Sequence, residues 1–130
     1  MAKYLDETVF TIRVARFLEK KGWKIVKRSS VVYELFYRED FARFPKAERG
    51  CHFDLVCTHK RAQKLFGIEI KNKMTNLSFG QAIGQCLYYL TIKPELSGAK
   101  IVYNTFLGGK EPNQGIVSRF DLPIEVLKVD

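Results

Sequence analysis

The stretch FGIEIKNK, residues 66–73, has the alternation of a β-strand but places an acid and a base on one face. Successive strand residues point to opposite sides, so Glu69 and Lys71 share one face while the apolar side chains share the other. An ordinary core strand would hold valine or leucine at these two positions. The pair is either a surface ion pair on a solvent-exposed sheet or one edge of an active site.

The composition is that of a soluble globular chain. The 130 residues are 46% hydrophobic, which suits one domain, residues 1–130, with a core of its own. No run of about 18 apolar residues is present, so we expect no membrane span. The first ten residues lack the charged and then apolar pattern of a secretory signal, so we expect an intracellular protein in the cytoplasm or nucleoid.

The cysteines form no CxxC pair. An odd count, Cys51, Cys57 and Cys86, predicts free thiols in a reducing compartment. The nearby His52 and His59 complete no common zinc spacing, so we predict no zinc site.

The charge balance is strongly basic. The chain has 22 Lys and Arg residues against 14 Asp and Glu residues, a net charge of +8. A basic surface is typical of proteins that bind polyanions, although solubility alone would also account for it.

Periodicity and turn residues predict a mixed α/β chain. The expected order is a helix at 5–21, strands at 23–28 and 31–38, a loop at 39–50, strands at 51–58 and 64–73, a helix at 78–93, a strand at 100–106, a loop at 108–115 and a short tail in which 124–129 is a strand. This α-β-β-β-β-α-β order with a tail predicts a central mixed β-sheet flanked by helices.

The helix ends carry recognisable signals. We expect Asp6 to cap the first helix and Gly22 to end it. Ser78 with Gln81 has the spacing of a capping box for the second helix, and Pro94 stops that helix.

Asp54 is a carboxylate inside the apolar run FDLV. Strand alternation would put it on the side of His52 and Val56, away from Phe53. Burying an unpaired carboxylate is costly, so Asp54 needs a cation or a donor. If the two neighbouring strands pair as a hairpin, Asp54 converges with Glu69.

Two converging carboxylates favour a divalent cation, because they repel each other without one. Oxygen ligands suit Mg²⁺, whose shell is completed by water and phosphate oxygens. A lysine beside that cation would steady an attacking hydroxide or a phosphate oxygen. Two carboxylates, a divalent cation and a lysine are the groups that hydrolysis of a phosphodiester bond needs.

The order of these residues resembles the PD-(D/E)XK nuclease superfamily over residues 5–106. Asp54 is followed fifteen residues later by Glu69-Ile70-Lys71 and then by a helix. The resemblance implies a restriction-endonuclease-like core in which Asp54, Glu69 and the Ile70 carbonyl bind Mg²⁺, with Mn²⁺ able to substitute. It also implies that Lys71 activates the water.

The second helix extends the resemblance. Its Gln85 and Tyr89 are similar to the QxxxY motif of the RecB-like branch, and Gln81 lies one turn before them. We expect Gln85 to act in catalysis, and Gln81 and Tyr89 to contact nucleic acid. An exposed polar helix face is the alternative.

Two positions depart from the family pattern or extend it. Phe53 stands where the family usually has proline. Many members carry an acid on the first helix, and Glu7 is the candidate metal ligand here.

Further nucleic-acid contacts are expected from basic side chains. Lys73 follows the proposed metal site directly, and Lys60 and Arg61 form a basic turn. Segment 31–44 interleaves aromatic and charged residues, which suits either nucleic acid or a dimer surface.

The sequence as a whole predicts a Mg²⁺-dependent DNA nuclease that is structure-selective or non-specific and forms a homodimer. A domain this small has little room for a base-reading module. The alternative is a nucleic-acid-binding or assembly protein whose nuclease fold is catalytically silent.

Overall fold

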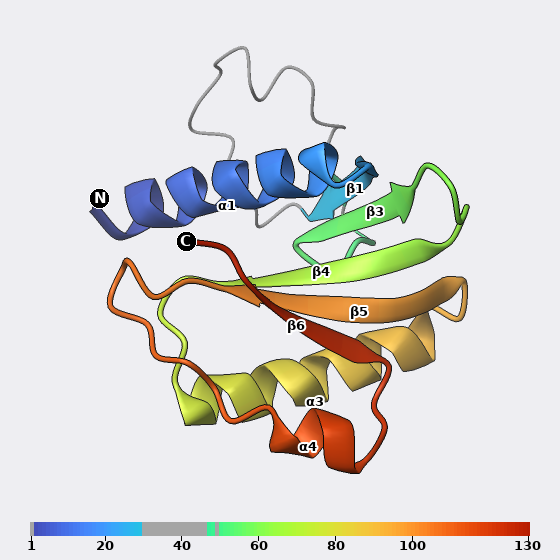
Figure 1. Ribbon diagram of the computed structural model, residues 1–130. Coiled ribbons are helices and arrows are strands. Elements are labelled where there is room, and N and C mark those ends of the chain that lie inside the picture. Colours follow the sequence, from blue (N-terminus) through green and yellow to red (C-terminus); the bar gives the residue numbers. More distant parts are fainter. Residues whose placement is uncertain (1, 30–46, 49) are drawn as a thin grey trace.

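The computed structural model describes residues 2–29, 47–48 and 50–130, and describes side chains in 9–29 and 50–130 (Figure 1). The strand expected at 31–38 and the aromatic segment 31–44 lie outside the described residues. The side chain of Glu7 lies outside them as well.

The first helix, α1, spans Ala2–Lys20. It begins three residues earlier than predicted, so Asp6 lies inside the helix and the prediction that it caps the start was wrong. The early start agrees with the helix propensity of the alanine, lysine and leucine residues in the first turn. Phe10, Val14 and Leu18 are buried on one face as expected. Gly22 follows with φ of +92°, a left-handed conformation that favours glycine.

The strands form one mixed sheet of six in the described part of the chain, in the order β2-β1-β3-β4-β5-β6. Strands β1, β3 and β4 pair antiparallel, whereas β4, β5 and β6 pair parallel, as do β1 and β2. The strands are β1 Trp23–Ser29, β2 Ala47–Glu48, β3 Leu55–His59, β4 Leu65–Lys71, β5 Leu96–Tyr103 and β6 Ile124–Lys128.

Strand β3 is shorter than predicted. It begins at Leu55, so residues 51–54 do not continue the strand alternation. Phe53 therefore packs in the same cluster as Val56, on the side opposite to Leu55, which corrects the expected faces. The reason lies at Gly67 of β4: a Cβ there would come within 2.2 Å of the Phe53 ring, which therefore occupies the space above the glycine.

The second long helix, α3, spans Asn76–Ile92 and has a different cap from the one predicted. Thr75 is the N-cap: its side chain accepts from the Ser78 N–H at 3.1 Å, and Ser78 Oγ accepts from the Thr75 N–H at 2.9 Å. The capping box exists, but Ser78 is its third helical residue, so the assignment of Ser78 and Gln81 was wrong. The helix ends before Pro94 as predicted.

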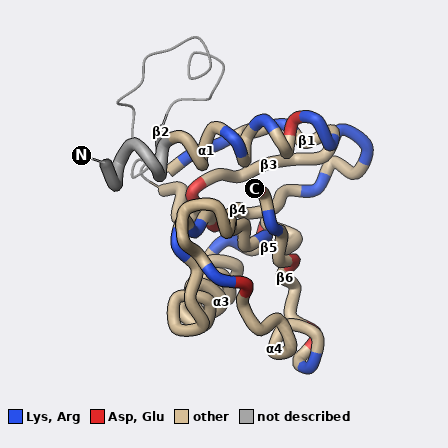
Figure 2. Tube along the Cα trace, turned by 60° about the vertical axis from the view of Figure 1, so that its left-hand side comes forward, with Lys and Arg blue, Asp and Glu red and all other residues tan. Residues whose placement is uncertain are grey.

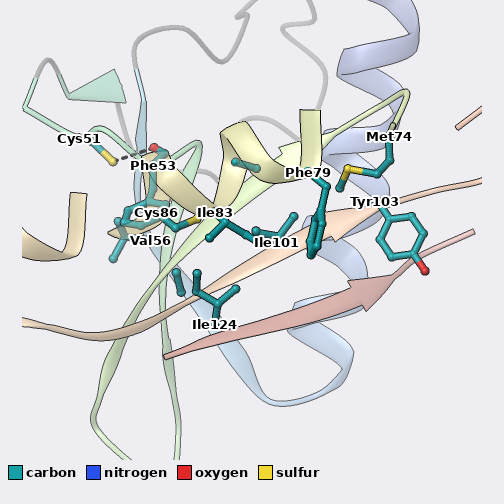
Figure 3. Packing of buried hydrophobic residues seen from close by; sticks show 12 residues of the cluster. Cys51, Phe53, Val56, Met74, Phe79, Ile83, Cys86, Ile101, Tyr103 and Ile124 are labelled. Atoms are coloured by element: carbon teal, nitrogen blue, oxygen red, sulfur yellow. Dashed lines mark hydrogen bonds between the residues drawn. The ribbon is translucent and has the colours of Figure 1, made fainter. Parts of the chain in front are cut away.

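Helices cover both faces of the sheet (Figure 1). Helix α1 packs on one face, over a cluster that includes Phe10, Leu55 and Ile68. Helix α3 covers the other face, and the short helix α4, Gly115–Arg119, lies beside it. Figure 3 shows Phe79, Ile83 and Cys86 of α3 packing toward the sheet. The fold class is therefore the predicted one, and the arrangement is consistent with a restriction-endonuclease-like core.

Strand β6 lies where the sequence placed the last strand. Strand β5 begins four residues earlier than predicted and ends three residues earlier. Within the described part of the chain, no helix combines the length and the apolarity needed to cross a membrane.

Candidate active site

The β3–β4 hairpin brings Asp54 and Glu69 together. Leu55 pairs with Ile68 in the antiparallel register, so the residue before Leu55 and the residue after Ile68 lie side by side. The Ile70 backbone N–H donates to Asp54 Oδ2 at 2.7 Å, and the Ser29 N–H donates to the Asp54 carbonyl at 3.0 Å. The convergence expected from the sequence is present in the structure.

Glu69 is buried, with 7% of its surface exposed. Burial and, after it, the negative charge of neighbouring Asp54 raise the pKa of its carboxyl to about 8, although the charge of Lys71 lowers it. Lys71 Nζ lies 3.7 Å from Glu69 Oε2. The alternative of an ion pair on a solvent-exposed sheet is therefore wrong, because α3 covers this face.

Two side chains of α3 face the carboxyl pair. Burial, followed by the charge of Glu69, raises the pKa of the Cys86 thiol to about 12. Burial followed by the charges of Glu69 and Asp54 also raises the pKa of the Tyr89 hydroxyl. Sequence reasoning did not nominate Cys86, although its place three residues before Tyr89 puts it on the same side of the helix. Its high pKa keeps it a thiol and not a nucleophilic thiolate.

The two glutamines of α3 lie on the solvent side. Gln81 and Gln85 are both exposed, and in the described part of the chain no hydrogen bond joins either amide to Asp54 or Glu69. Gln85 is one residue from Cys86, which is a rotation of about 100° around the helix axis. Gln85 therefore lies on an exposed flank of the helix, to one side of Cys86.

Two aromatic rings pack against Tyr89 of α3. The His52 ring stacks on Tyr89 with centroids 5.2 Å apart and an angle of 24° between the planes. The Phe53 ring meets the same tyrosine edge-on at 5.3 Å. His52 was expected beside Asp54 through strand alternation, and it instead reaches the site through Tyr89.

The basic residues fall at two separate places. Lys73 is exposed in the turn between β4 and α3, two residues after Lys71. Lys60 and Arg61 belong to the turn between β3 and β4, at the opposite end of the hairpin. Six residues of extended chain separate Asp54 from Lys60, which is about 20 Å. Lys73 therefore lies at the same end of β4 as the carboxyl pair, whereas Lys60 and Arg61 lie at the opposite end of the hairpin.

The carboxyl pair fits a hard divalent cation. The residues that the structure describes include no group of three or more His, Cys, Asp or Glu side chains suited to a metal ion. Mg²⁺ in proteins commonly uses only one or two carboxylates, with water and substrate oxygens completing the shell. A carboxyl buried beside a second one, with its pKa raised to about 8, is a group whose ionised form needs a nearby cation.

The chain is structurally similar to a protein of known structure. A crystal structure of an XisH family protein from Nostoc punctiforme is similar to this chain, with a TM-score of 0.47 and 17% sequence identity, covering 91% of this chain and 90% of that one. No family model matches the chain, and no curated protein matches it.

Proposed function

We propose that the protein is a Mg²⁺-dependent nuclease that hydrolyses phosphodiester bonds in DNA. The observation that carries the proposal is the pairing of buried Glu69 with half-buried Asp54, with the Lys71 ammonium 3.7 Å from Glu69. A structural sheet would be more stable with an apolar side chain at the buried position of Glu69, because desolvating a charged group is costly. Two acids and a base grouped at one place in a fold are typical of a site built for chemistry.

Each residue has a role that its position supports. Asp54 and Glu69 would hold the cation, with the backbone carbonyl of Ile70 as a further ligand. When bound, Mg²⁺ supplies positive charge that lowers the pKa of a coordinated water and offsets charge on the phosphate. Lys71 donates toward the attacking oxygen or a phosphate oxygen. The Ile70 N–H orients Asp54 through its 2.7 Å hydrogen bond.

Helix α3 and the turn before it supply the other side chains around the carboxyl pair and the substrate phosphates. Cys86 and the ring of Tyr89 limit water around the carboxyl pair from the α3 side. Gln85 acts from the exposed flank by positioning the scissile phosphate. Gln81 and Lys73 provide further phosphate contacts, which position the backbone without reading its sequence.

The net charge of +8 supports DNA as the substrate, because basic side chains release counterions when they contact phosphates. Cleavage is structure-selective or non-specific in this proposal, and the protein acts inside the cell. Mn²⁺ replaces Mg²⁺, since it accepts the same oxygen ligands.

The test is divalent-dependent cleavage of labelled single-stranded, blunt duplex, flap and four-way-junction DNA. Glu69→Gln removes the charge but keeps the shape of the protonated carboxyl, so the fold should persist. We expect cleavage by the wild type with Mg²⁺ or Mn²⁺ and a loss of more than about 10²-fold in the variant. Glu95→Gln is the matched control, because Glu95 is exposed outside the carboxyl pair, and it should cleave like the wild type.

Salt-sensitive DNA binding without cleavage, unchanged by Glu69→Gln, would instead support a binding or assembly protein with a silent nuclease fold. Equal cleavage by wild type and Glu69→Gln would exclude the carboxyl pair as the active site.

A further inference from the structure

The outer face of α3 carries no charge. The helix, NLSFGQAIGQCLYYLTI, contains no Lys, Arg, Asp, Glu or His over 17 residues, in a chain that is 28% charged. Figure 2 shows α3 without basic or acidic positions, whereas α1 carries several. Large apolar side chains nevertheless reach solvent here: Leu77 is 75% exposed and Tyr88 is 56% exposed. A solvated helix face would normally be charged.

Two glycines lie between these exposed side chains. Gly80 and Gly84 are exposed on α3, and a Cβ added to either would meet nothing within 4 Å. Glycine is the weakest helix former after proline, so alanine would favour the helix at both positions. Packing within one chain therefore gives no reason for them. Their effect is to let an external backbone approach the helix closely.

A groove lies beside this face, between α3 and α4. Its volume is about 620 Å³, and we call it the α3–α4 groove. Asn76, Gly80 and Ile83 line it on one side, and Ile116, Arg119 and Phe120 on the other. Phe120 is 61% exposed, and its ring centroid lies 5.4 Å from the Arg119 guanidinium. The outer face of α3 thus combines a ridge of exposed side chains, Leu77 and Tyr88, with the adjacent α3–α4 groove.

We propose that the outer face of α3 is a dimer interface that binds the same face of a second copy of this chain. Two α3 helices would cross antiparallel where Gly80 of each copy meets Gly84 of the other. Tyr88 lies four residues after Gly84, and Asn76 lies four residues before Gly80. The antiparallel arrangement therefore brings Tyr88 of each copy to the α3–α4 groove of the other, at the end lined by Asn76.

Charge identifies the occupant as a second copy. A two-fold interface places each surface against itself, so a charged patch would repel its own image. In a chain of net charge +8, an uncharged helix face tolerates this contact. An acidic protein would require cations on the face, and α3 has none. Arg119 in the groove suits the tyrosine ring of the incoming Tyr88, because guanidinium groups pack on aromatic faces.

The small size of the contact favours a weak dimer. A helix of 17 residues is roughly 25 Å long. One helix with an adjoining groove falls short of the roughly 800 Å² per partner that stable complexes bury, so we expect a reversible dimer that dissociates at about 10–100 µM. This inference is independent of the proposed nuclease function.

The experiment measures molar mass by sedimentation equilibrium from about 1 to 300 µM, spanning the expected dissociation range. Tyr88→Lys puts a cation on the ridge and should leave a monomer at every concentration, with an unchanged circular dichroism spectrum. Val9→Lys adds the same charge at an exposed apolar position of α1, and it should dimerise like the wild type.

Gly84→Ala should change the stability of the monomer and the affinity of the dimer in opposite directions. The added methyl group has open space in the monomer, so it should raise the melting temperature measured at about 1 µM, where the protein is monomeric. The same methyl group lies between the crossing helices, so it should weaken the dimer about tenfold or more. A purely structural position would not move these two quantities in opposite directions.

The proposal is overturned if the wild type stays monomeric throughout, or if Tyr88→Lys dimerises as well as the wild type. Loss of dimerisation in Val9→Lys as well would show that net charge and not this face controls association. DNA cleavage by the same variants reports separately on the nuclease proposal.

Discussion

The backbone N–H of Ile70 donates a 2.7 Å hydrogen bond to Asp54 Oδ2, across 16 positions of sequence. This bond turns the Asp54 carboxyl toward β4 at the point where the β3–β4 ladder ends. Glu69, the residue before Ile70, is thereby held beside Asp54. Asp54 and Glu69 are therefore neighbours because of the hairpin register and because of the hydrogen bond from the Ile70 N–H.

Replacing Asp54 separates its structural role from its catalytic one. Asp54→Asn keeps an oxygen that accepts from Ile70, so we expect a small change in the free energy of unfolding. Asp54→Ala leaves that N–H without its partner, which should cost about 1–3 kcal/mol. Urea unfolding measures the difference, and both variants should lose DNA cleavage. Equal stability of the two variants would contradict the structural role of the hydrogen bond.

The stability of the metal-free protein should fall as pH rises. The pKa of Glu69 is about 8 in the folded protein and near 4.5 in the unfolded chain, so the folded state binds more protons between these values. Protonated Glu69 therefore makes its full contribution to the free energy of unfolding below pH 4.5. This contribution is lost as pH rises to about 8. The loss should be on the order of 3–5 kcal/mol relative to a group that does not titrate.

Glu69→Gln provides that reference. Urea unfolding of both proteins between pH 4.5 and 9, with a chelator present, isolates the contribution of Glu69 because all other groups are shared. The difference in unfolding free energy should grow with pH in favour of the glutamine variant. A difference that stays constant with pH would show that the folded pKa of Glu69 is not raised.

Lys71 should influence both chemistry and the titration of its neighbour. Its ammonium lowers the pKa of Glu69, so Lys71→Met should move the end of the pH-dependent loss of stability above pH 8. The same variant should reduce cleavage by about 10²–10⁴-fold, since it removes the donor to the reacting oxygens. Lys71→Arg retains the charge and should preserve the titration while cleaving poorly, because a planar guanidinium replaces a compact ammonium.

Gly67 and Phe53 should behave as a coupled pair. A Cβ at Gly67 would lie 2.2 Å from the Phe53 ring, so Gly67→Ala should destabilise the fold by about 1–3 kcal/mol. In Phe53→Ala the ring is absent, so adding Gly67→Ala should cost less than it does in the wild type. A double-mutant cycle by urea unfolding measures this coupling, expected at about 1 kcal/mol or more. Additive effects would contradict the packing.

Some features were predictable because they depend on local periodicity. The alternation around Glu69 predicted strand β4, and the apolar spacing of Phe10, Val14 and Leu18 predicted the buried face of α1. The hairpin between adjacent strands then predicted that Asp54 meets Glu69. Each inference needed only neighbouring residues and a short connection.

Other features depended on contacts that the local sequence does not contain. Strand β5 begins at Leu96 because it pairs with β4, and the Phe66 ring packs over its Gly98, although serine and glycine are poor strand formers. The helix cap could have been Thr75 or Ser78, since both are preferred at that position, and only the path of the chain after β4 selected Thr75.

The sequence by itself determined the order of most helices and strands and the shared face of Glu69 and Lys71, because these follow from backbone geometry with periods of two and 3.6 residues. Tertiary structure alone decided that α3 covers this face. Burial of Glu69, its pKa of about 8 and the exposed flank of Gln85 all follow from that packing. An alternating strand looks the same in sequence whether its charged face meets water or a helix, since desolvation depends on residues distant along the chain.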